Sequence, residues 1–371
     1  MILGGAQENT LLTCEGLHRL GHEVTLVTGP TRGPEGELMT RALAGGYRVE
    51  VLPHLQRELR PYGDWRACRQ LTGLLRRLKP DLMHSHSSKA GILARQAAAR
   101  LGGMKIVHTI HGLPFHPYQG PLVRRLYVDL ERRAARQSDA IISVADAMTA
   151  QALGAGVGQP SQFSTIYSGM EVDRYIRRPM EADQWRSAMN LPAGAVLFTQ
   201  VSRLAELKGH KYILEALGRV RDPRVHVCFV GDGHWRQRIE ADISRRGLSG
   251  RLHLTGLLPP EQIPAILHAS DVLVHCSLRE GLSRAIPQAM LAGLPVISFD
   301  VDGAREVVNP NTGILLGPAD VSGLAAAIDT LAGSADLRRR LGQAGQSQCR
   351  TMFDHNRMVQ QIEALYRRLL G

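Results

Sequence analysis

Two series of alternating strand and helix patterns run along this chain of 371 residues, and they limit its fold more than any other feature. In each series, short strand patterns are separated by longer runs of helical periodicity. The first series predicts strands at 23–28, 48–52, 81–84, 105–109 and 140–144 and helices at 8–20, 65–78, 89–101 and 121–137. Such alternation predicts a parallel sheet with helices on both faces.

A second series begins near residue 195. It predicts strands at 195–201, 225–231, 252–255, 271–276 and 295–299 and helices at 208–220, 235–246, 260–268, 283–292 and 321–333. The polar stretch 168–191 between the two series is the predicted linker. We therefore expect two Rossmann-like, doubly wound α/β domains, 1–170 and 171–354, with a ligand cleft between the carboxyl ends of their sheets. The last helical pattern, 355–371, follows the second series.

The start of the chain departs from this pattern. Only Met1, Ile2 and Leu3 precede the turn at Gly4 and Gly5, whereas a typical strand has about 5–6 residues. We expect the first strand of the N-terminal domain to be truncated, because the true start lies upstream or because the natural chain begins short.

Composition is that of a soluble globular protein, with 44% hydrophobic and 21% charged residues. No apolar run approaches the ~20 residues that a membrane-spanning helix needs, and the start lacks the features of a signal peptide. The five cysteines are scattered and have no metal-ligand spacing. They predict reduced thiols in a cytoplasmic protein.

The formal charge of +11 suggests an anionic partner. Nucleic acid, an anionic membrane surface and a phosphate-bearing small molecule all fit, as does a merely solvated basic face. Nucleic acid is the weakest choice, because aromatic residues are only 5% of the chain and do not interleave with the basic ones. The arginine clusters of the first domain favour an anionic membrane surface.

Two basic residues of the second domain are candidates for phosphate binding. Arg203 follows a predicted strand and Lys208 opens the next predicted helix. The carboxyl end of a strand followed by a helix start is where α/β folds bind phosphate. Arg203 and Lys208 can thus neutralise a diphosphate without a metal ion.

A second loop follows the strand at 271–276. Its Glu280 can accept hydrogen bonds from sugar hydroxyls, although a surface acid near a helix start is the simpler explanation. The free backbone N–H groups of Gly281, Leu282 and Ser283 can hold an anion. Further glycines, Gly231 and Gly233, occupy a third loop of this type.

Histidines follow two predicted strands of the first domain. His111 can position a sugar or phosphate, although a lone histidine is more often structural. His84 and His86 are interpreted as pointing to opposite faces of their strand, and so as a poor metal pair. Asp300 and Asp302 resemble a cation-binding carboxylate pair but lack further ligands. We predict no metal site and no cofactor.

Together these motifs resemble the retaining glycosyltransferases of family 4, which have the GT-B fold. Their order and spacing are specific to that family over nearly the whole chain. They are Gly4-Gly5-Ala6-Gln7, Gly21-His22-Glu23-Val24, His86-Ser87-Ser88-Lys89-Ala90-Gly91, His111-Gly112, Ser202-Arg203-Leu204, Lys208-Gly209, Gly231-Asp232-Gly233 and Glu280-Gly281-Leu282.

The resemblance implies a role for each motif. Arg203 and Lys208 match the donor-diphosphate pair, and Glu280 matches the acid that contacts the transferred sugar. His111 matches the histidine near that sugar, and Gly5 would lie near the phosphates. The family's second glutamate, which binds the ribose of the nucleotide, is replaced here by Gln288, whose amide still accepts a hydrogen bond. The final helix of this family commonly packs back on the first domain.

The expected activity is metal-independent, retaining transfer of a hexose from a nucleotide-sugar, expected to be a UDP-sugar. The acceptor is expected to be a carbohydrate or a lipid-linked sugar, as in bacterial surface-polysaccharide or lipopolysaccharide synthesis at the inner face of the cytoplasmic membrane. A nucleotide-sugar epimerase and a binding subunit that has lost its activity are the alternatives. The sequence does not name the sugar, the acceptor or the oligomeric state.

Overall fold

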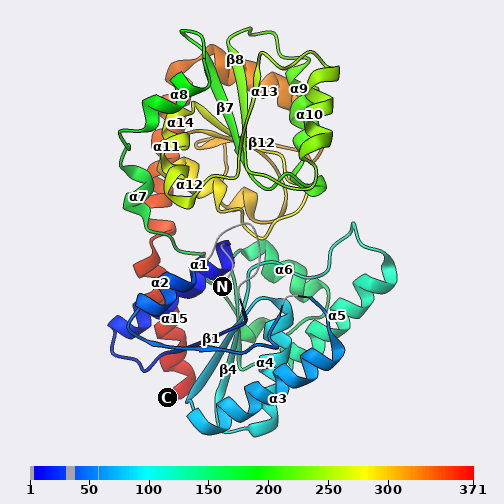
Figure 1. Cartoon of the computed structure of the whole chain (residues 1–371), viewed down its shortest axis with the longest axis vertical. Helices are drawn as coiled ribbons and strands as arrows, with labels where there is room; N and C mark the ends of the chain where they lie inside the picture. Colours follow the sequence, from blue (N-terminus) through cyan, green and yellow to red (C-terminus); the bar gives the residue numbers. More distant parts are fainter. Residues whose placement is uncertain (1–3, 31–37, 57) are drawn as a thin grey trace. The chain divides into compact units, whose positions relative to one another are not determined.

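The computed structural model describes residues 4–30, 38–56 and 58–371 of the chain. The chain forms two compact units (Figure 1). Unit 1 comprises Met1–Met170 and His355–Gly371, and unit 2 comprises Glu171–Asp354. The predicted truncation of a first strand concerns residues 1–3 and lies outside the described residues.

The described strands of unit 1 form two parallel sheets, where the sequence predicted one. Strands β1 (Thr25–Thr28) and β2 (Arg48–Val51) pair only with each other. The second sheet has the order β3-β4-β5-β6, with β3 at Leu82–His86, β4 at Lys105–Ile110, β5 at Ala140–Ser143 and β6 at Phe163–Thr165. Strand β6 was not predicted, because only three residues of it pair with β5.

Helices cover both faces of the four-stranded sheet. The helices of unit 1 are α1 (Gly5–Arg19), α2 (Met39–Ala44), α3 (Pro61–Leu78), α4 (Ser88–Leu101), α5 (Pro121–Ala135), α6 (Asp146–Gly154), α15 (His355–Leu370) and the short 3-10 helix η1 (Pro160–Gln162). On one face, Leu12 of α1 and Ile362 of α15 pack with Val107 of β4. On the other, Leu71 of α3 and Ala97 of α4 pack together. Each fully buried leucine or isoleucine contributes about 1.5–3 kcal/mol.

The last helix therefore packs in unit 1 although it follows unit 2 in the sequence. Figure 1 shows α15 beside α1, so both ends of the described chain lie in the same unit. A Cβ atom on Gly16 would come within 2.4 Å of a methyl group of Val359. A glycine at this position thus lets the two helices approach closely.

Unit 2 contains one parallel sheet of six strands in the order β12-β11-β10-β7-β8-β9. The strands are β7 (Val196–Val201), β8 (Val225–Val230), β9 (Leu252–Gly256), β10 (Val272–His275), β11 (Val296–Phe299) and β12 (Gly313–Leu316). The order reverses between β7 and β10, and ligands of doubly wound folds bind at the carboxyl ends of strands at such a point. The predicted α/β class with parallel sheets in two domains is confirmed.

Helices also enclose the sheet of unit 2. They are α7 (Val172–Ile176), α8 (Ala182–Ala188), α9 (His210–Leu217), α10 (Arg236–Arg245), α11 (Ile263–Ala269), α12 (Ala285–Leu291), α13 (Val321–Gly333) and α14 (Ala335–Met352), with short 3-10 helices η2 (Glu206–Lys208), η3 (Pro260–Gln262) and η4 (Asp302–Glu306). Strand β12 and helix α14 were not predicted. The hydroxyl of Ser334 accepts from the N–H of Leu337 and caps the start of α14.

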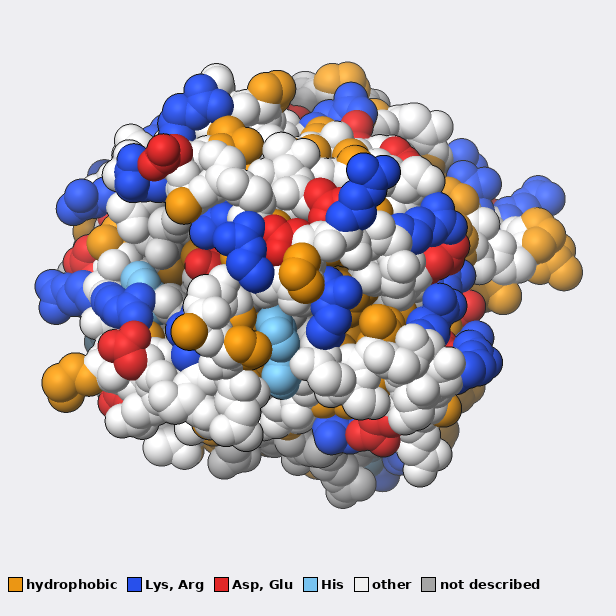
Figure 2. Space-filling model, turned by 90° about the horizontal axis from the view of Figure 1, so that it is seen from above, with side chains coloured by type: hydrophobic (Ala, Val, Ile, Leu, Met, Phe, Trp, Pro, Cys, Tyr) orange, Lys and Arg blue, Asp and Glu red, His pale blue; other side chains and the backbone are white. Residues whose placement is uncertain are grey.

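Charged side chains are distributed widely over the face that Figure 2 shows. Figure 2 shows Lys and Arg side chains across the whole face in view, with acidic and apolar side chains between them. The positive charge is therefore not gathered into one patch on this face. Among the described residues, no helix combines the length and the apolar character needed to cross a membrane.

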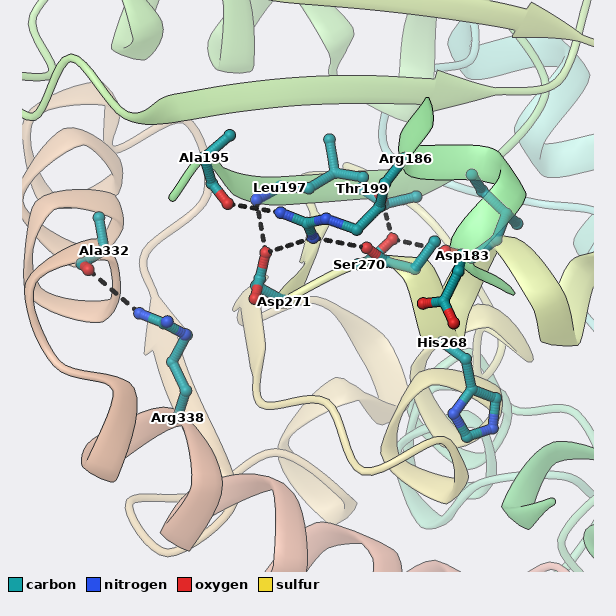
Figure 3. A network of polar contacts seen from close by, with 12 residues as sticks. Asp183, Arg186, Ala195, Leu197, Thr199, His268, Ser270, Asp271, Ala332 and Arg338 are labelled. Carbon is teal, nitrogen blue, oxygen red and sulfur yellow. Dashed lines mark hydrogen bonds and ion pairs between the residues drawn. The ribbon is translucent and has the colours of Figure 1, made fainter. Parts of the chain in front are cut away.

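The predicted linker, 168–191, was wrong in part, because half of it folds as α7 and α8 of unit 2. Arg186 of α8 donates hydrogen bonds to the carbonyls of Ala195 and Ala269 and pairs with Asp271 at 3.1 Å (Figure 3). Asp271 also accepts from the N–H of Leu197. These contacts lie at the amino ends of β7 and β10, at the edge opposite to their carboxyl ends.

Candidate active site

The loop after β7 brings Lys208 to the end of β10. Gly209 has φ 74°, and a Cβ atom there would lie 1.8 Å from the carbonyl oxygen of Cys276. Only glycine allows this close approach in a left-handed conformation. The N–H of Leu278 donates to the carbonyl of Leu207 at 2.8 Å, which joins the two loops. The prediction that Lys208 opens a helix was wrong, because Lys208 ends η2 and α9 begins at His210 after the left-handed Gly209.

Lys208 and Glu280 form an ion pair in the joined loops. The Lys208 Nζ contacts Glu280 Oε1, and the His275 Nε2 lies 3.5 Å from the same oxygen. The backbone N–H of Glu280 donates to Asp302 Oδ2 at 2.6 Å. Burial raises the pKa of Glu280, but Lys208 and His275 outweigh it and hold this pKa well below its usual value. The site therefore holds a fixed, ionised carboxylate beside an ammonium group.

The turn after Glu280 is not part of a helix. Helix α12 begins at Ala285, whereas the sequence predicted a start at Ser283. Pro287 has no N–H to bond the Ser283 carbonyl, which instead accepts from the N–H of Ile286 at 3.3 Å. The N–H of Gln288 then bonds the carbonyl of Arg284. Gly281, Leu282 and Ser283 thus lie in a loop, and Ser283 lines a small hollow with Glu280, His275 and Ser277.

Gln288 points to a neighbour within unit 2. Its amide Nε2 donates to the hydroxyl of Tyr175 on α7 at 2.9 Å. Tyr175 is buried, so this bond fixes the orientation of the amide. The carbonyl of the same amide is thereby directed away from Tyr175. The predicted contact of Gln288 with a ribose stays a prediction.

Gly231 and Gly233 let the loop after β8 pack on the loop that carries Arg203. Cβ atoms on these glycines would lie 2.2 Å from the carbonyl oxygen of Ser202 and 2.3 Å from that of Leu204. The N–H of Leu204 donates to the carbonyl of Asp232 at 3.0 Å. The two glycines therefore support the backbone on both sides of Arg203, whatever further contact they make.

A histidine cluster ends β3 and β4 in unit 1. The His86 Nδ1 lies 3.0 Å from the His111 Nε2, and the rings of His84 and His86 are 4.3 Å apart. The interpretation that His84 and His86 point to opposite faces was wrong, because residues two apart in a strand share a face. His84 also bonds the hydroxyls of Tyr366 and Thr109. Burial lowers the pKa of His86 to about 4, so its ring is neutral near pH 7.

A cavity of about 220 Å³ opens beside His111. It is lined by Ser87, His108 and Glu131, among other residues. Glu131 is buried and accepts from the Arg95 guanidinium at 3.0 Å. Among the described residues, the one acidic side chain that lines this cavity is therefore neutralised by Arg95. Gly5, the remaining predicted residue of unit 1, is the first residue of α1.

The pair Asp300 and Asp302 does not form a joint site. Asp300 binds the guanidinium of Arg305, whereas Asp302 accepts from the N–H of Glu280. Within the described ranges, no group of three His, Cys, Asp or Glu side chains is arranged to hold a metal ion. Asp302 instead fixes the loop of Glu280.

The structure thus groups the predicted residues by unit. Lys208 and Glu280 lie in contact, and Arg203 is two residues beyond β7 in the loop that leads to Lys208. His111 and Gly5 belong to unit 1. Sequence reasoning missed Asp302 and His275 as partners of Glu280. A histidine that ends a fully apolar strand was the available signal for His275.

Two family models cover most of the chain. The model described as glycosyl transferase 4-like domain matches residues 4–167, and the model described as glycosyl transferases group 1 matches residues 181–348. These matches fall on unit 1 and unit 2 respectively.

Several curated proteins are similar along most of their length. An Escherichia coli UDP-Gal:α-D-GlcNAc-diphosphoundecaprenol α-1,3-galactosyltransferase is 30% identical over 326 residues, which are 86% of this chain and 82% of the relative. A 2-deoxystreptamine glucosyltransferase of Streptomyces kanamyceticus is 31% identical over 264 residues, 68% of each chain.

Solved structures share the fold. The Anabaena protein HepE in complex with UDP-glucose has a TM-score of 0.83 at 23% identity, covering 99% of this chain and 97% of that one. WaaG, a glycosyltransferase of lipopolysaccharide biosynthesis, has a TM-score of 0.75 at 18% identity, covering 98% and 96%. The two family models and the E. coli relative together show that this chain belongs to the family 4 glycosyltransferases of the GT-B fold.

Proposed function

We propose that the protein transfers a hexose from a UDP-sugar to an acceptor hydroxyl, with retention of configuration and without a metal ion. The Lys208–Glu280 pair at the carboxyl ends of β7 and β10 is the observation that carries this proposal. It supplies an ammonium for a diphosphate and a carboxylate for sugar hydroxyls in one place. The name of the E. coli relative, a UDP-Gal transferase, and the UDP-glucose complex of HepE support the choice of nucleotide.

In this proposal the donor diphosphate is bound by Arg203 and Lys208. Negative charge grows on the leaving diphosphate as the bond to the sugar breaks, so cations fixed beside it stabilise the transition state more than the ground state. Two cations make a metal ion redundant there. The N–H groups of Gly281, Leu282 and Ser283 add donors to the same region.

The sugar and the nucleoside are assigned to other residues. Glu280 accepts hydrogen bonds from hydroxyls of the transferred sugar, because its carboxylate is ionised and held by Asp302 through the backbone. Gln288 accepts a hydrogen bond from the ribose. His111 contacts the transferred sugar, and Gly5 lies near the phosphates.

Retention follows from front-face transfer. The bond between the anomeric carbon and the phosphate oxygen breaks while the bond to the acceptor oxygen forms on the same face. The acceptor proton passes to the leaving phosphate oxygen, so no covalent sugar–enzyme intermediate is needed. The anomeric configuration of the product, measured by NMR, tests this step, and an inverted product would rule it out.

The acceptor is proposed to be a carbohydrate or a lipid-linked sugar at the inner face of the cytoplasmic membrane, in surface-polysaccharide synthesis. The diphosphoundecaprenol-linked substrate named for the E. coli relative supports this. Helices α3 and α5 of unit 1 also expose basic and apolar side chains together. These are Tyr62, Trp65, Arg66 and Arg69 on α3 and Leu122, Val123, Arg124, Arg125 and Leu126 on α5.

Vesicle binding tests the membrane part of the proposal. Vesicles with anionic lipids should bind the protein at low salt and release it as salt screens the charges. Charge reversal at Arg124 and Arg125 should weaken this binding without changing UDP affinity. Equal binding to neutral vesicles, or none at low salt, would count against a role of the membrane.

Thermal stability with added nucleotides tests the donor site. UDP at 100 times its dissociation constant should stabilise the protein by ~2.7 kcal/mol, whereas GDP and ADP should not. The shift should persist with EDTA and disappear in Lys208→Ala. A shift with GDP or ADP alone would overturn the choice of UDP, and a shift unchanged in Lys208→Ala would overturn the site.

A further inference from the structure

His275 is a buried polar side chain that the proposed donor contacts leave unexplained. It ends β10, and its side chain is only 4% exposed. Neither ring nitrogen has a hydrogen-bond partner among the described residues. Buried polar groups without partners are costly and therefore rare in folded proteins. A histidine at such a position is explained if it gains a hydrogen-bond partner in another state of the protein.

The Glu280 carboxylate is an acceptor that lies close to the His275 ring. The His275 Nε2 lies 3.5 Å from Glu280 Oε1, just beyond normal hydrogen-bond reach for a nitrogen donor. The Nζ of Lys208 contacts the same oxygen more closely. In the protein without ligand, Lys208 therefore satisfies this oxygen and His275 stands beside it.

Two other groups near this pair are already oriented toward different partners. His210 of α9 is buried, and its Nε2 faces the amide of Gln200 and the hydroxyl of Ser202 at 3.3 and 3.2 Å. Asp302 is acidic and binds the backbone of Glu280 rather than its carboxylate. Once Lys208 turns away, His275 is the side chain already placed to donate to Glu280 Oε1.

We propose that His275 is a positioning residue that holds the Glu280 carboxylate when Lys208 leaves it for the donor diphosphate. This inference rests on the proposed function. A diphosphate attracts Lys208, because it carries more negative charge than one carboxylate. Glu280 would then be a partly buried anion that has lost the contact with Lys208, free to turn away from the sugar. A hydrogen bond from the His275 Nε2–H keeps it aimed.

Two substitutions separate this role from simple packing. His275→Gln keeps an N–H donor at a similar reach, whereas His275→Phe keeps a ring of similar size and removes the donor. His253→Phe is the matched control, because His253 is a partly buried strand histidine of the same sheet whose Nε2 lies 3.2 Å from the Nδ1 of His226. Melting temperatures of all three variants check that they fold.

Calorimetry with UDP, UDP-glucose and UDP-galactose measures the effect on the sugar contact. The wild type should bind one of the two UDP-sugars more tightly than UDP. His275→Phe should keep its UDP affinity but lose that extra affinity. Its release of UDP from the same sugar nucleotide should fall by up to about 10²-fold, as expected when a positioning contact is lost. His275→Gln should recover most of the extra affinity and most of the rate of UDP release. His253→Phe should behave as the wild type.

The outcomes distinguish this inference from the donor assignment. Equal weakening of UDP and UDP-sugar binding in His275→Phe would show a structural role and overturn the inference. The inference would also be overturned if His275→Gln bound the UDP-sugar no more tightly than His275→Phe. It would be overturned as well if the wild type bound neither UDP-sugar more tightly than UDP. A wild type that does not bind UDP overturns the donor assignment itself, and the inference with it, before any variant is made.

Discussion

The two units each contain an ion pair near the carboxyl ends of their strands, but the two pairs are built differently. In unit 1, Arg95 and Glu131 are 1% and 4% exposed, and Arg95 also donates to the carbonyl of Gly91. In unit 2, Lys208 and Glu280 are 28% and 20% exposed, and Glu280 has His275 within reach as well. The first pair is enclosed, whereas the second is open to a ligand.

This difference separates an ion pair that keeps a fold from one that can exchange partners. A buried arginine with a planar guanidinium makes several fixed hydrogen bonds and cannot lose its proton. A lysine is a mobile point charge on a flexible stem. The enclosed pair therefore suits a permanent contact between α4 and α5, and the open pair suits a site where a diphosphate displaces the carboxylate.

Breaking the enclosed pair should give the largest effect on stability. Glu131→Gln leaves the buried guanidinium of Arg95 without a carboxylate, and Arg95→Met leaves the buried carboxylate of Glu131 without a cation. Loss of one partner of such a pair lowers the free energy of unfolding by about 3–5 kcal/mol. Urea unfolding followed in unit 1 measures this cost. The double variant Arg95→Met/Glu131→Leu should recover much of the loss.

An exposed pair of unit 2 provides the control. Arg236 and Glu240 lie one helical turn apart and are 37% and 47% exposed. Glu240→Gln should therefore cost only about 0.3–0.5 kcal/mol. If Glu131→Gln cost no more than this, the enclosed pair would not maintain the fold and the comparison would fail.

Breaking the open pair should affect turnover rather than stability. Lys208→Ala should lower the rate of UDP release from the donor about 10²–10³-fold, the usual loss when one stabilising donor is removed from a transition state. Its unfolding free energy should fall less than that of Glu131→Gln, because water reaches Glu280. Adding Glu280→Gln should restore stability but not turnover. Full activity of Lys208→Ala would refute the assignment of the diphosphate site.

Much of this arrangement was predictable from the sequence, because it depends on local patterns. The alternation of strands and helices predicted the parallel sheets, and Arg203, Lys208 and Glu280 stand where strands end. The predictions that were wrong concerned helix starts and the linker, which depend on tertiary contacts or on single residues. Pro287 delays α12, Gly209 interrupts the helix at Lys208, and the side chain of Arg186 binds the predicted linker to unit 2.

The residues that contact the catalytic candidates could not be predicted from the sequence either. Asp302 is 22 residues from Glu280, and a sequence shows nothing of the turn that brings its carboxylate to the Glu280 N–H. The ion pair of Arg95 and Glu131 joins two helices across 36 residues. Tyr175, the partner of Gln288, lies inside the predicted linker. These contacts depend on packing between distant segments.

Two glycines of unit 2 test whether close approach or backbone conformation positions Lys208. Gly209 and Gly247 have similar φ angles of 74° and 67°, but a Cβ atom on Gly247 would meet nothing within 4 Å. Gly247→Ala should cost only the roughly 1–2 kcal/mol of a left-handed alanine. Gly209→Ala should cost more and should also weaken UDP binding, because it pushes the Lys208 loop away from Cys276. Equal effects of the two substitutions would show that the contact with Cys276 is unimportant.

Acid pH should weaken both units, and single histidines should show which unit responds. Burial lowers the pKa of His86 in unit 1 to about 4, and burial, with Lys208 and His275, lowers that of His210 in unit 2 to about 4. Between about pH 6.5 and 4 the unfolded chain binds more protons at these residues, so stability falls as the pH falls. Each histidine should account for less than about 1 kcal/mol between pH 7 and 6.

Hydrogen exchange of peptides from each unit, compared at pH 7 and pH 6, shows how much stability each unit loses as the pH falls. His86→Asn should reduce the acid sensitivity of unit 1 peptides only, because asparagine keeps a polar group near His111 but does not titrate. His210→Gln should do the same for unit 2 peptides only. If either variant protected both units, their stabilities would be coupled, and the enclosed and open ion pairs could no longer be compared as features of independent units.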